Sequence, residues 1–217
     1  MVLSLPNKQE IQATVKNEEL IRIRREQMIK GAVSLFKEKG FHRATTREIA
    51  HASGFSIGTL YEYIRKKEDI LYLVCDQIYD EVQWRLRGRL QYRRVTAETL
   101  KKGIAAYFKI MDEMQDEVLV MYQEAKSLSK EALPHVLNKE LEMVEIFVDM
   151  IRAFVRSEGL DVPEPAVRLA AHNIVVQGQM WAFRRWALRK QYTLEEYTEL
   201  QTRFLLNALC PDPPKKG

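Results

Sequence analysis

The residues best suited to acid–base or metal chemistry are the chain's four histidines, its many carboxylates and its two cysteines. Glu48 and His51 match half of the Glu-x-x-His pattern of helical di-iron proteins, which need two such pairs and two further helical Glu residues. None of the other histidines has Glu three positions before it: His42, His135 and His172. The sequence also lacks a His-Glu-x-x-His, a Gly-x-Ser-x-Gly and a glycine-rich phosphate loop. It therefore predicts no catalytic residue, no metal site, no cofactor and no enzyme.

The cysteines and the hydropathy pattern indicate where the protein works. Cys75 and Cys210 fit neither a disulfide framework nor the paired spacing of a zinc site, which favours a reducing cytoplasm. Residues 1–19 lack the apolar centre of a signal peptide. The most apolar stretch, residues 141–155, is interrupted by charged residues. We therefore expect a cytoplasmic protein with no membrane partner.

A second group of residues, between positions 45 and 67, is suited to binding rather than catalysis. Thr45 and Glu48 have the spacing of a capping box, which predicts a short helix over residues 46–52. Gly54 can take a positive φ in the turn that follows. Ser56 can cap a third short helix that runs to Ile64. A short helix, a turn and a second short helix, preceded by a longer helix, can place one exposed helix in a major groove of DNA.

The net positive charge of the chain is concentrated around this segment. Residues 20–70 hold 11 basic and 6 acidic residues, whereas residues 71–217 hold 21 of each. Such a local excess is expected of a module that contacts phosphates. The outward positions that could touch DNA are mostly hydroxyl-bearing or basic: Thr46, Arg47, Ser56, Ile57, Thr59, Tyr61, Tyr63 and Lys67. The inward positions are apolar: Ile49, Ala50, Phe55, Leu60 and Ile64.

Helical periodicity continues through the rest of the chain, and no stretch alternates as a half-buried strand would. The pattern predicts an all-α protein. Besides the two short helices, we expect helices over residues 17–39, 68–92, 96–114, 116–127, 130–157, 164–190 and 194–208.

The segments 45–50, 53–64 and 67–71 together resemble the signature of the TetR family of transcriptional regulators, with Ile64 where the family commonly has Phe. The resemblance covers about residues 21–73. It implies a DNA-binding domain at 17–67 and a ligand-binding and dimerisation domain at 68–210. A flexible arm at 1–16 and a flexible tail at 211–217 would flank them.

The same resemblance assigns roles to individual residues. Thr46 and Arg47 would meet phosphate or a groove edge, and Tyr61 and Lys67 would contact phosphate. Four residues would face the base edges: Ile57, Gly58, Thr59 and Tyr63. Gly58 has no side chain and would let the backbone approach the bases closely. A homodimer would bring two such sites to a pseudo-palindromic operator in double-stranded DNA.

Family resemblance also implies dimerisation through the last two long helices. Small and apolar residues on the first of them suit close helix packing: Ala170, Ala171, Ile174, Gly178 and Ala182. The second would add Phe204, Leu205 and Leu209. The alternative is that this face packs only within its own subunit.

TetR-like proteins hold a small-molecule pocket behind the DNA-binding domain. Aromatic and methionine side chains are candidates to line it: Trp84, Tyr107, Met111, Met121 and Tyr122. A polar stripe on one helix adds Asn173, Gln177, Trp181 and Arg184, and the run Trp181-x-x-Arg184-Arg185-Trp186 is similar to TetR relatives that sense acyl-coenzyme A thioesters. The alternatives are that the methionines fill the core, that the arginines pair with surface acids and that the tryptophans lie in the dimer seam.

These observations predict a repressor that an apolar or acyl-coenzyme A-like effector releases from its operator. The rival reading is a helical lipid or acyl carrier without specific DNA binding. A carrier would need a basic amphipathic helix with an exposed apolar face, whereas residues 56–64 place Gly, Thr and Tyr outward.

Overall fold

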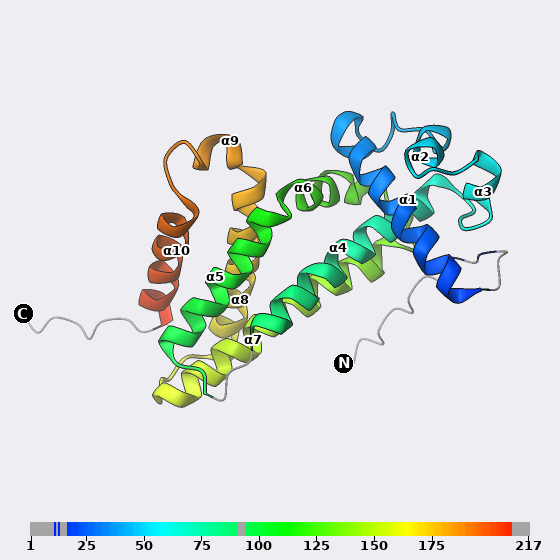
Figure 1. Ribbon diagram of the computed structural model, residues 1–217. Coiled ribbons are helices and arrows are strands. Elements are labelled where there is room, and N and C mark those ends of the chain that lie inside the picture. Colours follow the sequence, from blue (N-terminus) through cyan, green and yellow to red (C-terminus); the bar gives the residue numbers. More distant parts are fainter. Residues whose placement is uncertain (1–10, 12, 14–16, 91–93, 210–217) are drawn as a thin grey trace, which may run out of the picture. The chain divides into compact units, whose positions relative to one another are not determined.

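The computed structural model describes residues 11, 13, 17–90 and 94–209, and every regular element within them is a helix (Figure 1). The predicted all-helical fold is therefore confirmed. The elements follow in the order α1 (Glu18–Lys39), α2 (Thr46–Ala52), α3 (Ile57–Tyr61), α4 (Lys67–Arg89), α5 (Ala97–Glu113), α6 (Gln115–Glu124), the 3₁₀ turn η1 (Ala125–Ser127), α7 (Leu133–Glu158), α8 (Glu164–Phe183), α9 (Arg185–Leu188) and α10 (Leu194–Leu209).

The chain divides into two compact units. The first holds the residues up to Asp80 together with Asp116–Glu140, and the second holds Glu81–Gln115 and the residues from Leu141 onward. The predicted tail at 211–217 lies outside the described residues, as does the predicted arm at 1–16 apart from residues 11 and 13. The boundary expected at residues 67 and 68 stays a prediction.

Helix α1 organises the first unit. Its start is capped by Asn17, whose side chain accepts a hydrogen bond from the backbone N–H of Leu20 at 3.0 Å. It ends at Gly40, which has φ +79° and lets the chain turn back. Met28 and Phe36 are buried, and the ring of Phe36 packs edge-on against Phe41, with ring centroids 5.5 Å apart.

Charged side chains are buried between α4 and α7 in the same unit. Asp76 accepts a hydrogen bond from Lys139 Nζ at 2.5 Å, and one Asp76 oxygen lies 2.9 Å from Nε2 of His135. Lys139 also pairs with Asp80. Burial alone would lower the pKa of Lys139, but its hydrogen bonds to Asp76 and Asp80 raise it above the ordinary value. The charges therefore meet partners, as buried ions must.

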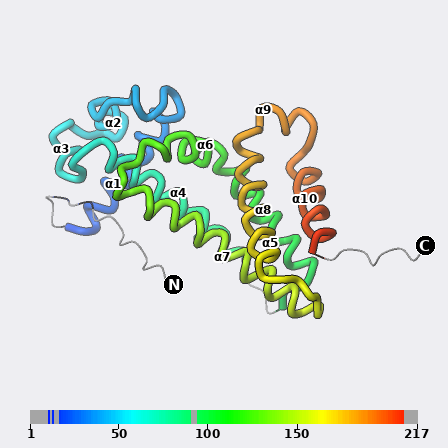
Figure 2. Tube along the Cα trace, turned by 180° about the vertical axis from the view of Figure 1, so that it is seen from behind, coloured from blue at the N-terminus to red at the C-terminus, as the bar shows by residue number. Residues whose placement is uncertain are grey.

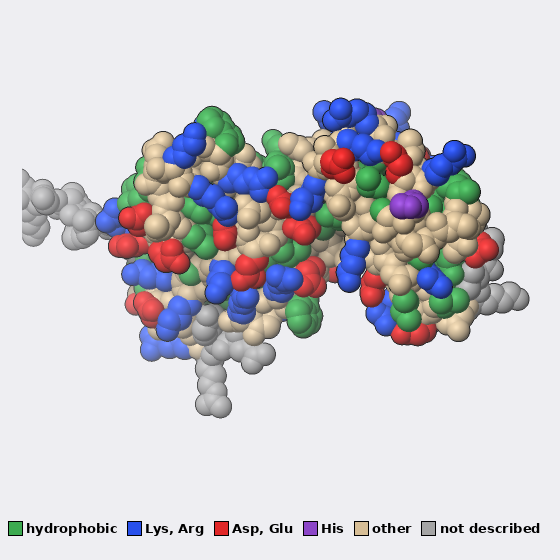
Figure 3. All heavy atoms as spheres, turned by 45° about the horizontal axis from the view of Figure 1, so that its top comes forward, with side chains coloured by type: hydrophobic (Ala, Val, Ile, Leu, Met, Phe, Trp, Pro, Cys, Tyr) green, Lys and Arg blue, Asp and Glu red, His purple; other side chains and the backbone are tan. Residues whose placement is uncertain are grey.

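In the second unit, α5 packs against α8 and α10 (Figure 2). Aromatic rings fill the core: Tyr107 lies 5.2 Å from Phe147 and Phe108 lies 5.6 Å from Tyr197, measured between ring centroids. The ring of Trp181 lies 5.0 Å from Tyr197. Acidic and basic side chains are interspersed on the face of this unit seen in Figure 3, as its even charge balance predicts.

The helix expected over residues 164–190 is interrupted. The structure ends α8 at Phe183, because Arg184 takes φ −105° and ψ 19°, which is outside helical geometry. A short helix, α9, follows. The prediction of one continuous helix was therefore wrong.

Candidate nucleic-acid interface

The second helix begins with the capping box that the sequence predicts. The Thr45 hydroxyl accepts a hydrogen bond from the Glu48 backbone N–H at 3.2 Å, and the Glu48 carboxylate accepts one from the Thr45 backbone N–H at 2.9 Å. Glu48 also forms an ion pair with Lys39. The hydrogen bond from Lys39, followed by those from Thr45, lowers the pKa of Glu48 to about 2. Glu48 is therefore a capping residue, and no group of three potential metal ligands occurs among the described residues.

The third helix is only five residues long, Ile57–Tyr61, and depends on its cap and one anchor. Ser56 Oγ accepts a hydrogen bond from the Thr59 backbone N–H at 3.0 Å, and the two hydroxyls also lie 3.0 Å apart. Leu60 is fully buried beneath the helix. Ile57, Gly58 and Tyr61 are exposed, and Thr59 is half-buried.

The first turn of α2 and the whole of α3 are held together at one surface. The hydroxyl of Tyr61 donates a hydrogen bond to Oγ1 of Thr46 at 3.3 Å. Beside Thr46, Arg47 is exposed and has no hydrogen-bond or ion-pair partner among the described residues. Seven of the predicted contacts are exposed or half-buried on α2, α3 and the residue that caps α3: Thr46, Arg47, Ser56, Ile57, Gly58, Thr59 and Tyr61.

Tyr63 does not belong to this surface. Its side chain is only 3% exposed, so the prediction that it faces bases requires correction. The physical reason is the early end of α3 at Tyr61: past the C-cap Glu62 the backbone leaves the helix and turns Tyr63 inward beside Ile64. The Tyr63 carbonyl accepts a hydrogen bond from Arg25 Nη2 of α1 at 3.5 Å.

Lys67 has a structural position that the sequence did not reveal. Its ammonium group donates to the carbonyl oxygens of Phe41, His42 and Ala44, at 3.0, 3.3 and 3.2 Å. It also lies 4.3 Å from the centroid of the Phe41 ring. These bonds use all three ammonium hydrogens. Lys67 thus fixes the loop between α1 and α2, and the predicted phosphate contact is not what its geometry favours.

Close packing of α1 on the end of α2 depends on a glycine that sequence reasoning missed. A Cβ added at Gly31 would lie 2.7 Å from Ser53 Oγ and 3.1 Å from the backbone of Ala52. Only glycine permits this approach without displacement. Its single signal in the sequence is its occurrence in the middle of a strongly helical segment. Gly54, in the following turn, takes the positive φ that was expected, +74°.

The predicted effector residues belong to both units and differ in burial. Trp84 and Tyr122 are 73% and 63% exposed, so neither side chain lines an enclosed pocket. Both were assigned to the pocket from residue type alone, which does not reveal the side of a helix that is buried. Met121 is buried in the first unit, whereas Tyr107 and Met111 are buried in the second.

The polar stripe on α8 is also divided. Trp181 is buried and donates from Nε1 to the Asp112 carboxylate at 2.7 Å, so this indole has a partner within the subunit. Asn173 and Arg184 are exposed and Gln177 is half-buried. The guanidinium of Arg184 lies 5.7 Å from the ring of Trp186, which is also exposed.

The small residues of α8 pack inside the subunit, which corrects the predicted seam. A Cβ built at Gly178 would lie 2.9 Å from Cδ1 of Tyr107 and closer still to Cε1, so Gly178 lets α8 approach α5. Its buried companions on α8 are Ala170, Ala171, Ile174 and Ala182. On α10, Leu205 and Leu209 are buried as well. The apolar side chains that α8 and α10 expose are instead Leu169, Val176 and Phe204.

Comparisons with known proteins agree with this geometry. Residues 28–72 match the model described as bacterial regulatory proteins, tetR family, and residues 94–184 match the tetracyclin repressor-like C-terminal domain. Among curated relatives, HTH-type transcriptional regulator HbdR of Aromatoleum sp. (strain CIB) is 26% identical over 91% of this chain and 85% of its own length. HTH-type transcriptional repressor KstR2 of Mycolicibacterium smegmatis is 29% identical over 75% of this chain and 78% of its own.

A solved structure shares the fold. AibR, in complex with isovaleryl coenzyme A and operator DNA, superposes with a TM-score of 0.68 at 17% identity, over 83% of this chain and 97% of AibR. In the described part of this chain, none of the helices has the length and apolar character needed to cross a membrane.

Proposed function

Because this chain belongs to the tetR family and is thus a transcriptional regulator, we propose that it is a homodimeric repressor that a small effector releases from a pseudo-palindromic operator. The observation that carries the DNA-binding part of this proposal is the exposed edge of α3, which its Ser56 cap and the bond between Tyr61 and Thr46 hold in place. Such a repressor acts in the cytoplasm, where its operator lies.

We assign base contacts to the first residues of α3. Ile57 offers an apolar group to a thymine methyl, Thr59 offers a hydroxyl, and Gly58 lets the backbone approach the base edges. Arg47 and Tyr61 are assigned to phosphates, because Arg47 is exposed with its guanidinium unpartnered among the described residues.

The test is a selection of bound sequences from random duplex DNA at low salt, followed by binding at rising salt. We expect an inverted repeat, with selectivity lost in Ile57→Ala and Thr59→Ala. The matched control is Tyr63→Phe, which removes only a hydroxyl from a buried ring. Binding that is steeply salt-sensitive but independent of sequence would contradict the proposal.

We assign the dimer seam to the apolar side chains that α8 and α10 leave exposed, namely Leu169, Val176 and Phe204. When a second copy of the chain covers these exposed apolar side chains, the free energy of the system falls, which favours association. Light scattering should find a dimer for the wild type and a monomer for Val176→Glu with Phe204→Glu. A double variant that stays dimeric would refute this seam.

We assign the effector to an apolar or acyl-coenzyme A-like class. Support comes from the Arg184 guanidinium beside the Trp186 indole, because such a pair suits a phosphate next to an adenine ring. AibR, which shares the fold, binds isovaleryl coenzyme A. Tyr107, Met111 and Trp181 are kept as candidates to line the apolar part of the site, whereas Trp84 and Tyr122 are omitted.

Thermal unfolding of the whole chain tests the effector class. Isovaleryl coenzyme A should raise the Tm and release the selected operator, and isovalerate alone should do neither. Arg184→Ala should weaken both effects, while Arg156→Ala, an exposed arginine in the same unit, should leave them intact. If another ligand class shifts the Tm and the thioester does not, the acyl assignment is wrong.

We propose that release travels through contacts of α6 and η1 with the end of α1 and the loop that follows it. The Glu124 carboxylate accepts a hydrogen bond from the Phe41 backbone N–H at 3.0 Å, and Ser127 Oγ lies 3.1 Å from Nε2 of His42. Lys37 forms an ion pair with Asp116 at 2.8 Å. A displacement of α6 would therefore move the loop that Lys67 fixes.

A further inference from the structure

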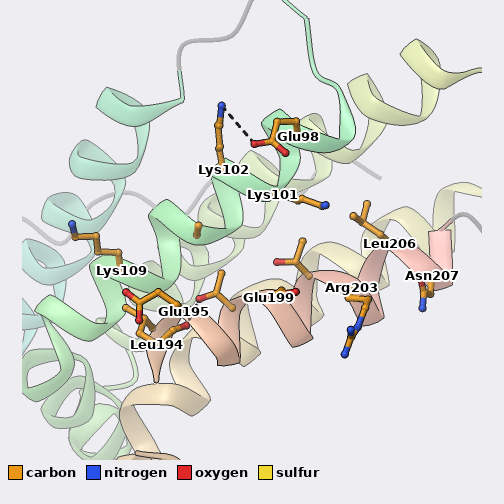
Figure 4. A pocket seen from close by; sticks show the side chains of 13 residues that line it. Glu98, Lys101, Lys102, Lys109, Leu194, Glu195, Glu199, Arg203, Leu206 and Asn207 are labelled. Carbon is orange, nitrogen blue, oxygen red and sulfur yellow. Dashed lines mark hydrogen bonds and ion pairs between the residues drawn. The ribbon is translucent and has the colours of Figure 1, made fainter. Parts of the chain in front are cut away.

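A groove of about 650 Å³ runs between α5 and α10 in the second unit. Figure 4 shows that side chains of these two helices form its walls. Its volume is typical of small-molecule sites in proteins. None of the residues proposed above to contact the effector lines it.

Along α5, two lysines and an alanine create the hollow. Lys101, Ala105 and Lys109 are spaced by four residues and so lie on one face of the helix. Ala105, in the middle, carries only a methyl group, which leaves the space open. Leu194 and Leu206 of α10 add apolar surface opposite. The groove therefore offers an apolar floor with ammonium groups at its edges.

The wall of the groove that α10 forms contains a buried polar group without a hydrogen-bond partner among the described residues. Thr202 lines the groove and is only 4% exposed. Its hydroxyl is buried and has no hydrogen-bond partner among the described residues. A buried hydroxyl without a partner costs free energy, which a ligand with a hydrogen-bonding group could recover.

The charges restrict the kind of ligand. Lys102 is paired with Glu98 at 3.6 Å, whereas Lys101 has no acidic partner within the described residues and extends towards Leu206 in Figure 4. Glu195 and Glu199 line the groove together with Lys109 and Arg203, so its charges nearly balance and suit a ligand with a single charge better than a polyanion such as nucleic acid. One negative charge next to Lys101 would be attracted.

We infer that this groove binds an amphipathic monoanion, a carboxylate on an apolar chain. The carboxylate of the ligand would meet Lys101, and its apolar chain would cover Ala105 and Leu206. The Thr202 hydroxyl would donate a hydrogen bond to the same carboxylate. The groove lies on the face of α10 opposite the proposed dimer seam, because Phe204 follows Thr202 by two residues, roughly 200° around the helix. Dimerisation would leave the groove accessible.

Isothermal titration of the whole chain with octanoate, below its micelle-forming concentration, tests the inference. We expect saturable binding of octanoate, weaker binding of octyl phosphate and none of octylamine or acetate. Octyl phosphate binding as tightly as octanoate would overturn the carboxylate assignment. Octylamine binding equally well would overturn the role of Lys101.

Variants locate the site and separate it from the proposed effector site. Lys101→Ala should weaken octanoate roughly tenfold or more, since hydrogen bonds to charged groups contribute at that level. The matched control is Lys190→Ala, an exposed lysine of the same unit outside the groove. Octanoate binding that Arg184→Ala abolishes and Lys101→Ala leaves unchanged would place the ligand elsewhere and refute the groove, whatever the fate of the proposed function.

Thr202→Val gives a test with two opposite signs. The substitution keeps the shape of the side chain and removes the unpartnered hydroxyl, so the Tm of the free protein should rise. Octanoate affinity should fall, because the hydrogen bond to the carboxylate is lost. A higher Tm with unchanged affinity would show that the hydroxyl has no part in binding and would overturn its role.

Discussion

The hydroxyl of Tyr61 lies 3.3 Å from Oγ1 of Thr46 and so joins the end of α3 to the first turn of α2. Both residues belong to the proposed DNA-binding surface. A hydrogen bond between side chains at a surface contributes little to stability, but it restricts the positions from which each side chain can contact DNA.

Tyr61→Phe should therefore weaken operator binding more than folding. We expect roughly a 3- to 10-fold loss of affinity, the usual worth of one hydrogen bond, with an almost unchanged Tm. Fluorescence anisotropy with the selected operator measures it. Tyr192→Phe, which removes an exposed hydroxyl from the second unit, is the control, and an equal loss in both variants would count against the assignment.

Substitution of Lys67 should mainly affect stability. Lys67→Met removes the cation from the three carbonyl groups of the α1–α2 loop, which should lower the free energy of unfolding by about 1–3 kcal/mol. Lys66→Met, at an exposed neighbouring position, should have little effect. Urea unfolding gives the difference. If Lys67→Met instead retained full stability and reduced the salt dependence of DNA binding, the lysine would be a phosphate contact after all.

The capping box makes the stability of the first unit sensitive to acid. Glu48 has a folded-state pKa of about 2, below its ordinary value of 4.5, so its ionised form stabilises the fold at neutral pH. This contribution is lost as the pH falls from about 4.5 towards 2. Wild type should therefore be more stable than Glu48→Gln at pH 6, and the difference should shrink at pH 4 and again at pH 3. A difference that is constant across these three unfolding curves would contradict the assignment.

Two glycine-to-alanine substitutions should have opposite signs. Gly178→Ala places a methyl group against the Tyr107 ring and should destabilise the protein by about 1–3 kcal/mol through overpacking. Gly88→Ala, in helix α4 with open space around its Cα, should stabilise it by up to about 1 kcal/mol. Thermal unfolding measures both. A stabilising Gly178→Ala would mean that α8 and α5 are not in close contact.

Local signals predicted the elements well where the capping chemistry is contained in a few residues. The box formed by Thr45 and Glu48 set α2 at 46–52, and in the structure Thr193 and Glu196 form the same kind of box at the start of α10. The third helix was expected to reach Ile64 but ends at Tyr61, and the burial of Tyr63 and Ile64 beyond its end is not indicated by the local residue types.

Side-chain orientation could not be obtained in the same way. Residue type favours a role in the effector pocket for Trp84 and a contact with DNA bases for Tyr63, yet Trp84 is exposed and Tyr63 is buried. The helical pattern shows that α8 has a small-residue face, but not that α5 covers it through Tyr107. Each of these outcomes depends on a partner distant in the sequence, which a local pattern does not specify.

The positions of the three tryptophans determine what the intrinsic fluorescence of the folded protein reports. Trp84 and Trp186 are largely exposed, whereas Trp181 is buried and bonded to Asp112. Emission from two water-exposed indoles is already shifted to long wavelength in the native state, so unfolding should move the maximum only slightly. Dehydration of Trp84 or Trp186 by a bound molecule or a second copy of the chain would instead produce a blue shift. Tryptophan emission should thus follow binding better than it follows denaturation.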